Sequence, residues 1–141
     1  MHAKGVVLVF ILPMMLMTVV WGCTTGRRAY VPSEIEQYYG EWMNMDFDER
    51  IIYKNDGTFE NYFGKATIPR WYGTLVITEQ WKDREGAVWY KTVVENQVGM
   101  TRYVLSRISE SGTVLEQVFF SNDYPSELDP KLVSYRVYKR Q

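Results

Sequence analysis

The residue types that carry most enzyme chemistry are scarce in this sequence. It contains one histidine, His2, and one cysteine, Cys23. A Ser/His/Asp or Cys/His nucleophile system, or a zinc site built on His or Cys, therefore cannot be assembled from residues 24–141 of one chain. Among the carboxylates, no pair stands out by its spacing as an acid and base for hydrolysis. We therefore expect a protein without catalysis and without a cofactor.

Acidic residues gather in one stretch, SNDYPSELDP at 121–130, which contains Asp123, Glu127 and Asp129. Carboxylates are ligands that Ca²⁺ prefers, but the stretch does not follow the calcium-loop pattern. We expect a solvated connection here and no metal site. The chain as a whole carries 16 basic and 17 acidic residues without a basic block. That balance predicts no nucleic-acid partner.

Cys23 directly follows an apolar run. Val6 to Val20 is nearly all apolar, and its 15 residues fall short of the ~20 that a helix needs to span a bilayer. The stretch Val20-Trp21-Gly22-Cys23 resembles the lipobox of bacterial lipoproteins. The resemblance implies a signal peptide at 1–22, an acylated Cys23 that anchors the protein in the lipid bilayer, and a tether over 23–33. The alternative is an uncleaved membrane anchor with an incidental cysteine.

Thr24 extends the same resemblance to localisation. A residue other than Asp after the cysteine is similar to the pattern of lipoproteins that reach the outer membrane. The expected location is therefore the bacterial cell envelope, at the outer membrane.

The rest of the sequence predicts one β-rich domain over 34–141. Ser33 stands three residues before Glu36, as in a capping box, and Gly40 follows, so we expect a short helix over 34–39. Beyond it, runs rich in β-branched and aromatic residues alternate with turn signals such as KNDG at 54–57. The runs predict eight strands, at 40–45, 49–54, 58–63, 70–80, 86–95, 100–108, 113–121 and 132–140.

Short connections leave no room for crossover helices. We therefore expect an all-β fold in which each strand pairs antiparallel with the next and the sheet closes into an eight-stranded up-and-down barrel. The tight turns, at 54–57, 82–86 and 109–112, fall at one end of such a barrel. The longer connections, at 45–49, 63–70, 95–99 and 121–131, fall at the other. The expected helix and tether join the tight end, so the mouth faces away from the membrane.

Three motifs resemble the lipocalins and their relatives in the calycin superfamily. Gly40-x-Trp42 resembles the Gly-x-Trp opening of lipocalins, and IIYKNDGTFENYF at 51–63 is similar to the second hairpin of small bacterial lipocalin-like domains. In the last strand, Arg136 is similar to the late arginine that packs across the first-strand tryptophan of lipocalins. The resemblance implies that Gly40, Trp42 and Arg136 close the base of the barrel. Arg136-x-Tyr138 also resembles the ending with which fatty-acid-binding proteins hold a lipid carboxylate.

Six residues are candidates for a ligand site inside the barrel: Arg136, Tyr138, Trp71, Trp89, Tyr90 and Arg107. Strand alternation puts Arg136 and Tyr138 on one face, where they can hold an anionic head group, and Arg107 can add a second charge. The three aromatic residues can line an apolar cavity.

Each candidate has an alternative interpretation. The opposite register of the last strand turns Val133, Tyr135 and Val137 inward and leaves Arg136 outside. Independently of that register, the alternative for Arg102 and Arg107 is that they are solvated strand residues, and the alternative for the aromatic residues is that they are ordinary barrel core.

The expected function is to bind a small apolar or amphipathic molecule. This predicts a cavity of ~300 Å³ or more at the end with the longer connections. The alternative is an interaction module that binds an envelope protein or a cell-wall partner with those connections. It predicts a filled barrel and an exposed apolar patch that includes Phe63, Ile68, Tyr124 and Leu128.

Overall fold

The computed structural model describes residues 34–141. The signal peptide, acylated Cys23 and tether expected in residues 1–33 lie outside the described residues. Eight strands follow one another: β1 (Gly40–Asn44), β2 (Glu49–Tyr53), β3 (Thr58–Phe63), β4 (Trp71–Lys82), β5 (Val88–Asn96), β6 (Thr101–Ile108), β7 (Val114–Phe120) and β8 (Arg136–Arg140).

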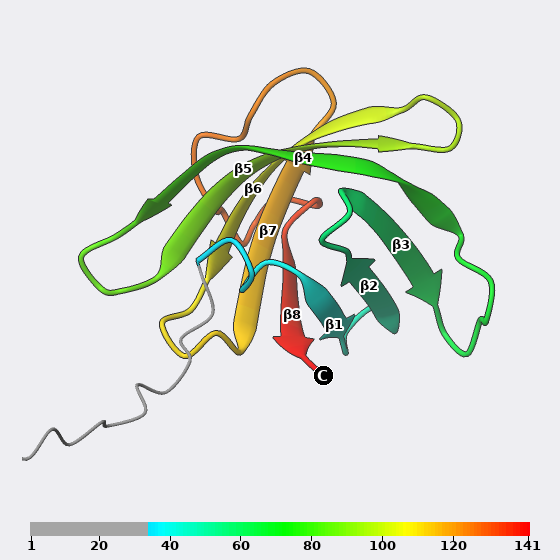
Figure 1. The fold of residues 1–141 in the computed structure, drawn as a ribbon, viewed down its shortest axis with the longest axis horizontal. Coiled ribbons are helices and arrows are strands. Elements are labelled where there is room, and N and C mark those ends of the chain that lie inside the picture. Colours follow the sequence, from blue (N-terminus) through cyan, green and yellow to red (C-terminus); the bar gives the residue numbers. More distant parts are fainter. Residues whose placement is uncertain (1–33) are drawn as a thin grey trace, which may run out of the picture. The chain divides into compact units, whose positions relative to one another are not determined.

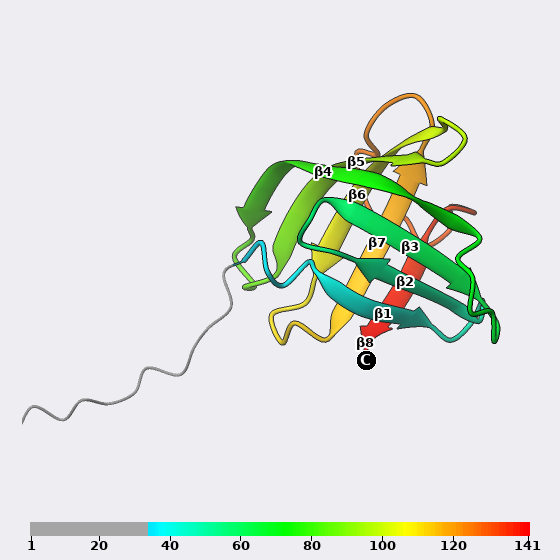
Figure 2. The same cartoon turned by 45° about the vertical axis from the view of Figure 1, so that its right-hand side comes forward.

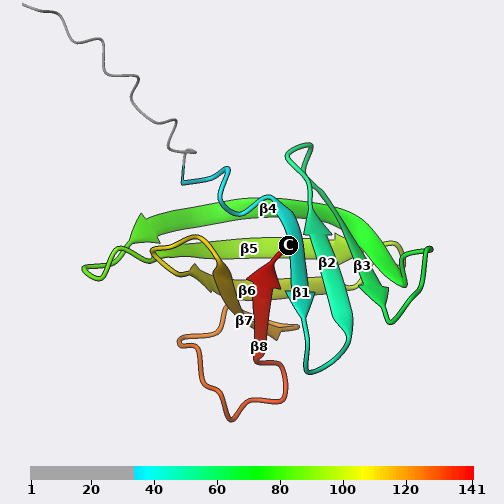
Figure 3. The ribbon, with the colours of Figure 1, turned by 90° about the horizontal axis from the view of Figure 1, so that it is seen from below.

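The strands form one closed antiparallel barrel. Each strand pairs with its neighbour in the sequence, and β8 also pairs with β1 through Trp42↔Arg140 and Met43↔Lys139. Figures 1 and 3 show β8 (red) beside β1 at this closure. The expected eight-stranded antiparallel barrel is confirmed, and closure leaves no sheet edge unpaired.

The segment before β1 differs from expectation. Residues 34–38 form turns, and residues 34–141 contain no helix, so the helix expected over 34–39 is not formed. The amide of Tyr38 donates to the carbonyl oxygen of Ile35 at 3.2 Å, which closes a single turn. So short a segment gains too few hydrogen bonds to offset the cost of starting a helix. Within the described part of the chain, no helix has the length and apolarity that a membrane crossing requires.

The last strand begins later than expected, at Arg136 instead of position 132. The preceding residues form turns, in which Leu132 donates to the carbonyl of Asp129 at 3.1 Å and Tyr135 to that of Leu132 at 3.0 Å. These local hydrogen bonds compete with strand pairing. The connection from β7 to β8 is therefore long, residues 121–135, and is orange to red in Figures 1 and 2.

The connections separate to the two ends as expected. One end of the barrel holds segment 34–39 and the tight turns at 54–57, 83–87 and 109–113. We call it the closed end. The connections at 45–48, 64–70, 97–100 and 121–135 lie at the other end, which we call open.

Aromatic residues fill the closed end. Tyr38 is fully buried, and its ring centroid lies 4.7 Å from that of Tyr53 and 4.8 Å from that of Tyr90. Its hydroxyl accepts hydrogen bonds from Gln117 Nε2 at 3.1 Å and Thr92 Oγ1 at 3.3 Å. Segment 34–39 thus seals the barrel with a side chain whose polar atom is satisfied.

Arg140 completes the seal. Its guanidinium carbon lies 4.3 Å from the ring centroid of buried Trp42. It donates to the carbonyl oxygens of Gly112 at 2.9 Å and Tyr39 at 3.2 Å, and to that of Gln37. The partner expected for Trp42 was Arg136, and this pairing is wrong. Both arginines face inward, but they are four residues apart on the strand, so Arg136 lies nearer the open end.

Gly40 also belongs to the closed end. Its φ is +126°, a backbone conformation that glycine adopts readily and other residues rarely do. A Cβ at this position would also lie 3.1 Å from Nη1 of Arg140. Gly73 permits a second close approach, because a Cβ there would lie 1.9 Å from the carbonyl oxygen of Glu95. Gly73 pairs with Asn96, so the long strands β4 and β5 can approach closely where they pair in the barrel wall.

Candidate ligand-binding cavity

A cavity of about 270 Å³ occupies the open end of the barrel. Its wall is mainly apolar and includes Phe47, Phe63, Trp71, Met100 and Phe119. These side chains come from the open ends of strands or from the open-end connections, where the packed core stops. Tyr53, Gln117 and Tyr138 lie between the cavity and the closed end. The cavity is thus an apolar chamber with polar side chains below it.

One wall of the cavity holds a half-buried carboxylate, that of Glu49, whose side chain is 12% exposed. Glu49 accepts a hydrogen bond from the Tyr138 hydroxyl at 2.9 Å and one from Asn61 Nδ2 at 2.7 Å. Arg136 Nε lies 3.9 Å from the same carboxylate. Burial, and then the nearby charge of Glu49, hold the pKa of Tyr138 well above its usual value, so this hydroxyl stays a donor.

Arg136 faces inward but is already engaged. Besides Glu49, it donates through Nη1 to the carbonyl oxygens of Val133 at 2.6 Å and Tyr135 at 2.8 Å. Its guanidinium also lies 4.2 Å from the centroid of the Phe47 ring. Arg136 and Tyr138 therefore line the cavity, as the inward register predicts, but an internal carboxylate occupies the place expected for a ligand's anionic group.

Arg102 is the cavity residue that the sequence analysis missed. It lines the cavity from β6, and its guanidinium lies 5.6 Å from the centroid of the Phe119 ring. No carboxylate among residues 34–141 pairs with it. Its alternation with inward Val104 and Ser106 was the available signal, but Tyr103 and Leu105 made the opposite face equally plausible. Arg102 is the cation in this cavity that remains available to an anionic group.

Asn61 contributes an unused acceptor beside the cavity. Its side chain is buried, and Oδ1 accepts no hydrogen bond from the described residues. A buried carbonyl oxygen without a donor costs about 1–3 kcal/mol. Such a group is uncommon in a stable interior.

The other predicted site residues have different places. Trp71 lines the cavity. Tyr90 faces inward but lies at the closed end, where its hydroxyl donates to the carbonyl oxygen of Glu34. Trp89 and Arg107 lie on the outer face of the barrel, so their expected role inside it is wrong. Alternation explains the error, because the inward residues of β5 include Val88 and Tyr90, which flank Trp89.

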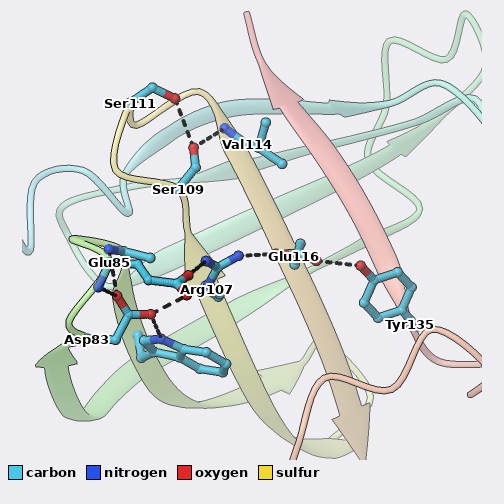
Figure 4. Close-up of polar contacts among 10 residues, drawn as sticks. Asp83, Glu85, Arg107, Ser109, Ser111, Val114, Glu116 and Tyr135 are labelled. Atoms are coloured by element: carbon cyan, nitrogen blue, oxygen red, sulfur yellow. Dashed lines mark hydrogen bonds and ion pairs between the residues drawn. The ribbon is translucent and has the colours of Figure 1, made fainter.

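Arg107 belongs to a polar network on the outside, shown in Figure 4. It lies 3.0 Å from Glu116, 3.3 Å from Glu85 and 3.7 Å from Asp83. The hydrogen bond from the Trp89 indole, at 2.8 Å, is the main reason that the pKa of Asp83 is lowered. The second charge expected from Arg107 in the cavity is therefore supplied by Arg102.

Comparison of the chain with protein-family models, with curated protein sequences and with solved structures finds no match. Residues 34–141 also contain no cluster of three or more His, Cys, Asp or Glu side chains suited to a metal ion. The geometry of the cavity is therefore the main guide to the function of the protein.

Proposed function

We propose that this protein is a lipid-anchored lipoprotein of the bacterial outer membrane, with a lipocalin-like barrel that binds a small amphipathic molecule without catalysis. The observation that carries the proposal is the cavity at the open end, with its apolar wall and Arg102, which pairs with no carboxylate of residues 34–141. The apolar part of the ligand packs against Trp71, Phe63 and Phe119, and an anionic group meets Arg102. The Asn61 acceptor favours a ligand that also carries a donor.

The size of the cavity limits the ligand. The volume of the cavity is about 270 Å³. It lies at the lower edge of the range of ligand pockets, ~300–1,000 Å³. A short-chain amphiphile fits such a space better than a long lipid does.

The proposal of a membrane anchor is based on the sequence at 20–23. If Cys23 is acylated, the chain reaches the barrel at its closed end, because Glu34 contacts Gln80 at 3.1 Å and Lys82 at 3.9 Å there.

An interaction module that binds an envelope protein remains the second candidate, since open-end side chains such as Ile68 are exposed. The patch expected for it differs, however. Phe63 lines the cavity, and Tyr124 is only partly exposed, with its hydroxyl 2.6 Å from that of Thr78.

Native mass spectrometry of residues 24–141, followed by extraction of anything that co-purifies, tests the ligand proposal. We expect a retained organic molecule that is lost from Arg102→Ala. Arg84→Ala is the matched control, because Arg84 is exposed on the 83–87 turn and lies far from the open end. A mass without ligand, unchanged after incubation with an envelope lipid extract, would contradict ligand binding and favour the interaction module.

A further inference from the structure

The open end of the barrel exposes apolar side chains on all four of its connections. They are Met45, Phe47, Ile68, Val98, Met100 and Val133, between 44% and 92% exposed, and we call them the apolar rim. They make up half of the twelve large apolar side chains that are exposed among residues 34–141. Most of the others lie on segment 34–39 and on the outer faces of β4 and β8. Apolar side chains concentrated at one end mark a contact surface.

The apolar rim continues into the cavity. Phe47 and Met100 belong to both, since each lines the cavity and is also substantially exposed. An apolar chain can therefore move from a surface that covers the rim into the cavity while it stays in contact with apolar side chains. This continuity connects the exposed surface to the proposed ligand site.

The charges around the apolar rim restrict what covers it. The four open-end connections carry three basic residues (Lys65, Arg70 and Lys131) and five acidic ones (Asp46, Asp48, Asp123, Glu127 and Asp129). Such a surface has no cationic excess with which to attract anionic lipids. The open end of the barrel is therefore better suited to contact a lipid surface that carries no net charge.

The residue types favour a lipid surface over a protein. Protein interfaces are anchored mainly by Trp, Tyr and Arg. The apolar rim contains Val, Ile, Met and one Phe, most of which partition well into hydrocarbon and need no directional partner. They also stand on separate connections around an opening, and a fluid bilayer adapts to that arrangement.

We propose that the apolar rim docks onto a zwitterionic lipid surface, so that the amphipathic ligand passes directly between bilayer and cavity. The proposal of docking depends only on the exposed rim, whereas the proposal of ligand transfer also rests on the proposed function. Because the chain enters the barrel at the closed end, the rim is free to meet a bilayer on the side opposite that entrance.

Site-specific fluorescence on the full-length chain tests the docking. Cys23→Ser removes the natural cysteine, and Val98→Cys or Val133→Cys then carries an environment-sensitive fluorophore. Val76→Cys is the matched control, since Val76 is 59% exposed on the outer face of β4. The apolar run at 6–20 is present in all three proteins, so differences between the labels report the orientation of the barrel.

With vesicles of phosphatidylcholine that has brominated acyl chains, we expect a blue shift and quenching at positions 98 and 133 but not at 76. Equal quenching at all three positions would indicate non-specific adsorption and would overturn the proposal. Absence of quenching at 98 and 133 would overturn it too. Crosslinking of position 98 to an envelope protein, without quenching, would identify the rim as a protein interface instead.

A rim variant separates docking from ligand binding. Ile68→Ser, Val98→Ser and Val133→Ser together remove three side chains that do not line the cavity. We expect transfer of a fluorescent short-chain fatty acid between phosphatidylcholine vesicles to fall by about tenfold or more, with unchanged binding in solution. Undiminished transfer would contradict the inference while the ligand site stands. If rim quenching occurs but the native protein binds no ligand, the proposed function fails and the docking survives.

Discussion

Individual side chains at the closed end hold the barrel together. Arg140 contacts the Trp42 ring and donates to carbonyl oxygens of three residues that precede β1 or belong to the β6–β7 turn. These carbonyls come from parts of the chain that are distant in sequence. One guanidinium thus joins segment 34–39, the 109–113 turn and the last strand, and its planar fork suits several acceptors at once.

The loss of Arg140 should therefore destabilise the fold. We expect Arg140→Ala to lower the free energy of unfolding by about 3 kcal/mol, because a cation–π contact and charge-assisted hydrogen bonds disappear together. Urea unfolding measures this. Lys139→Ala is the control, since Lys139 is exposed and should change the value by ~0.5 kcal/mol or less. Equal effects of the two changes would show that Arg140 does not seal the barrel.

Buried tyrosines give the protein a pH limit on the alkaline side. Burial is the main cause that raises the pKa of Tyr38, Tyr53 and Tyr138, the last two well above the usual value. In the unfolded chain these hydroxyls lose their protons near pH ~10, whereas in the folded barrel they keep them. Stability is thus fully present below pH ~10 and is lost as the pH rises above it.

Tyr138→Phe isolates one of these groups. Above pH ~10, we expect the unfolding free energy of the native protein to fall more steeply than that of Tyr138→Phe, by about 1.4 kcal/mol per pH unit. Urea unfolding at a series of pH values between 8 and ~11.5 measures both slopes. Parallel slopes would mean that Tyr138 ionises inside the folded barrel, against the burial seen here.

At the scale of elements, segment 34–39 acts as the stopper of the barrel. Its only fully buried side chain is Tyr38, which packs between Tyr53 and Tyr90 and satisfies Gln117 and Thr92. The segment has little secondary structure of its own, so its position depends on the packing of Tyr38 together with the hydrogen bonds that Arg140 and Tyr90 donate to its carbonyl oxygens.

Two changes at Tyr38 separate packing from hydrogen bonding. Tyr38→Ala should cost about 3–5 kcal/mol through the cavity it leaves. Tyr38→Phe should cost about 1–2 kcal/mol, because the buried Thr92 hydroxyl loses its acceptor, whereas Gln117 Nε2 still donates to Tyr53 and Ser106. Ile35→Ala in the same segment is the control, because Ile35 is already exposed. The three unfolding free energies from urea titration check the order. A small effect of Tyr38→Ala would place the seal of the closed end elsewhere.

The elements were predictable to the extent that local signals set them. Turn sequences such as Asn55-Asp56-Gly57 and the alternation of β-branched residues determine the strands, their order and the separation of short from long connections. Segment 34–39 and the start of β8 escaped prediction, because in both places tertiary contacts and local turns override the pattern. The capping box at Ser33 predicts the start of a helix. Packing of the segment did not allow that helix to continue.

Whether a residue lies on the inner or the outer face of the barrel was harder to predict than the strand to which it belongs. Leu105 is only 3% exposed although it points outward, because residues of the 121–135 connection lie over it. When both faces of a strand are covered, hydrophobicity no longer distinguishes inside from outside. This is why Arg102 was missed, and why Trp89 and Arg107 were placed inside. The four-residue shift from Arg136 to Arg140 has a different cause: both residues share the inward face, and alternation does not indicate which of them lies at the depth of Trp42.

The molecule as a whole is divided between a packed half and a hollow half. Most of the fully buried side chains, among them Trp42, Ile108 and Leu115, lie toward the closed end, and the cavity lies toward the open end. Packing supplies stability in the first half, and the second half leaves space that a ligand can fill. Stability and binding should therefore respond to changes at different positions.

Two enlargements on the same strand test this division. Val94 lines the cavity and Val88 is 2% exposed in the closed-end core, and both face inward from β5. We expect Val94→Phe to change the unfolding free energy by ~1 kcal/mol or less, because the ring enters existing space, and to abolish ligand retention in native mass spectrometry. Val88→Phe should cost about 1–3 kcal/mol through overpacking. If Val94→Phe is as destabilising as Val88→Phe, the open half is packed as tightly as the closed half. Binding inside the barrel would then lose its physical basis, because no apolar space would remain for a ligand.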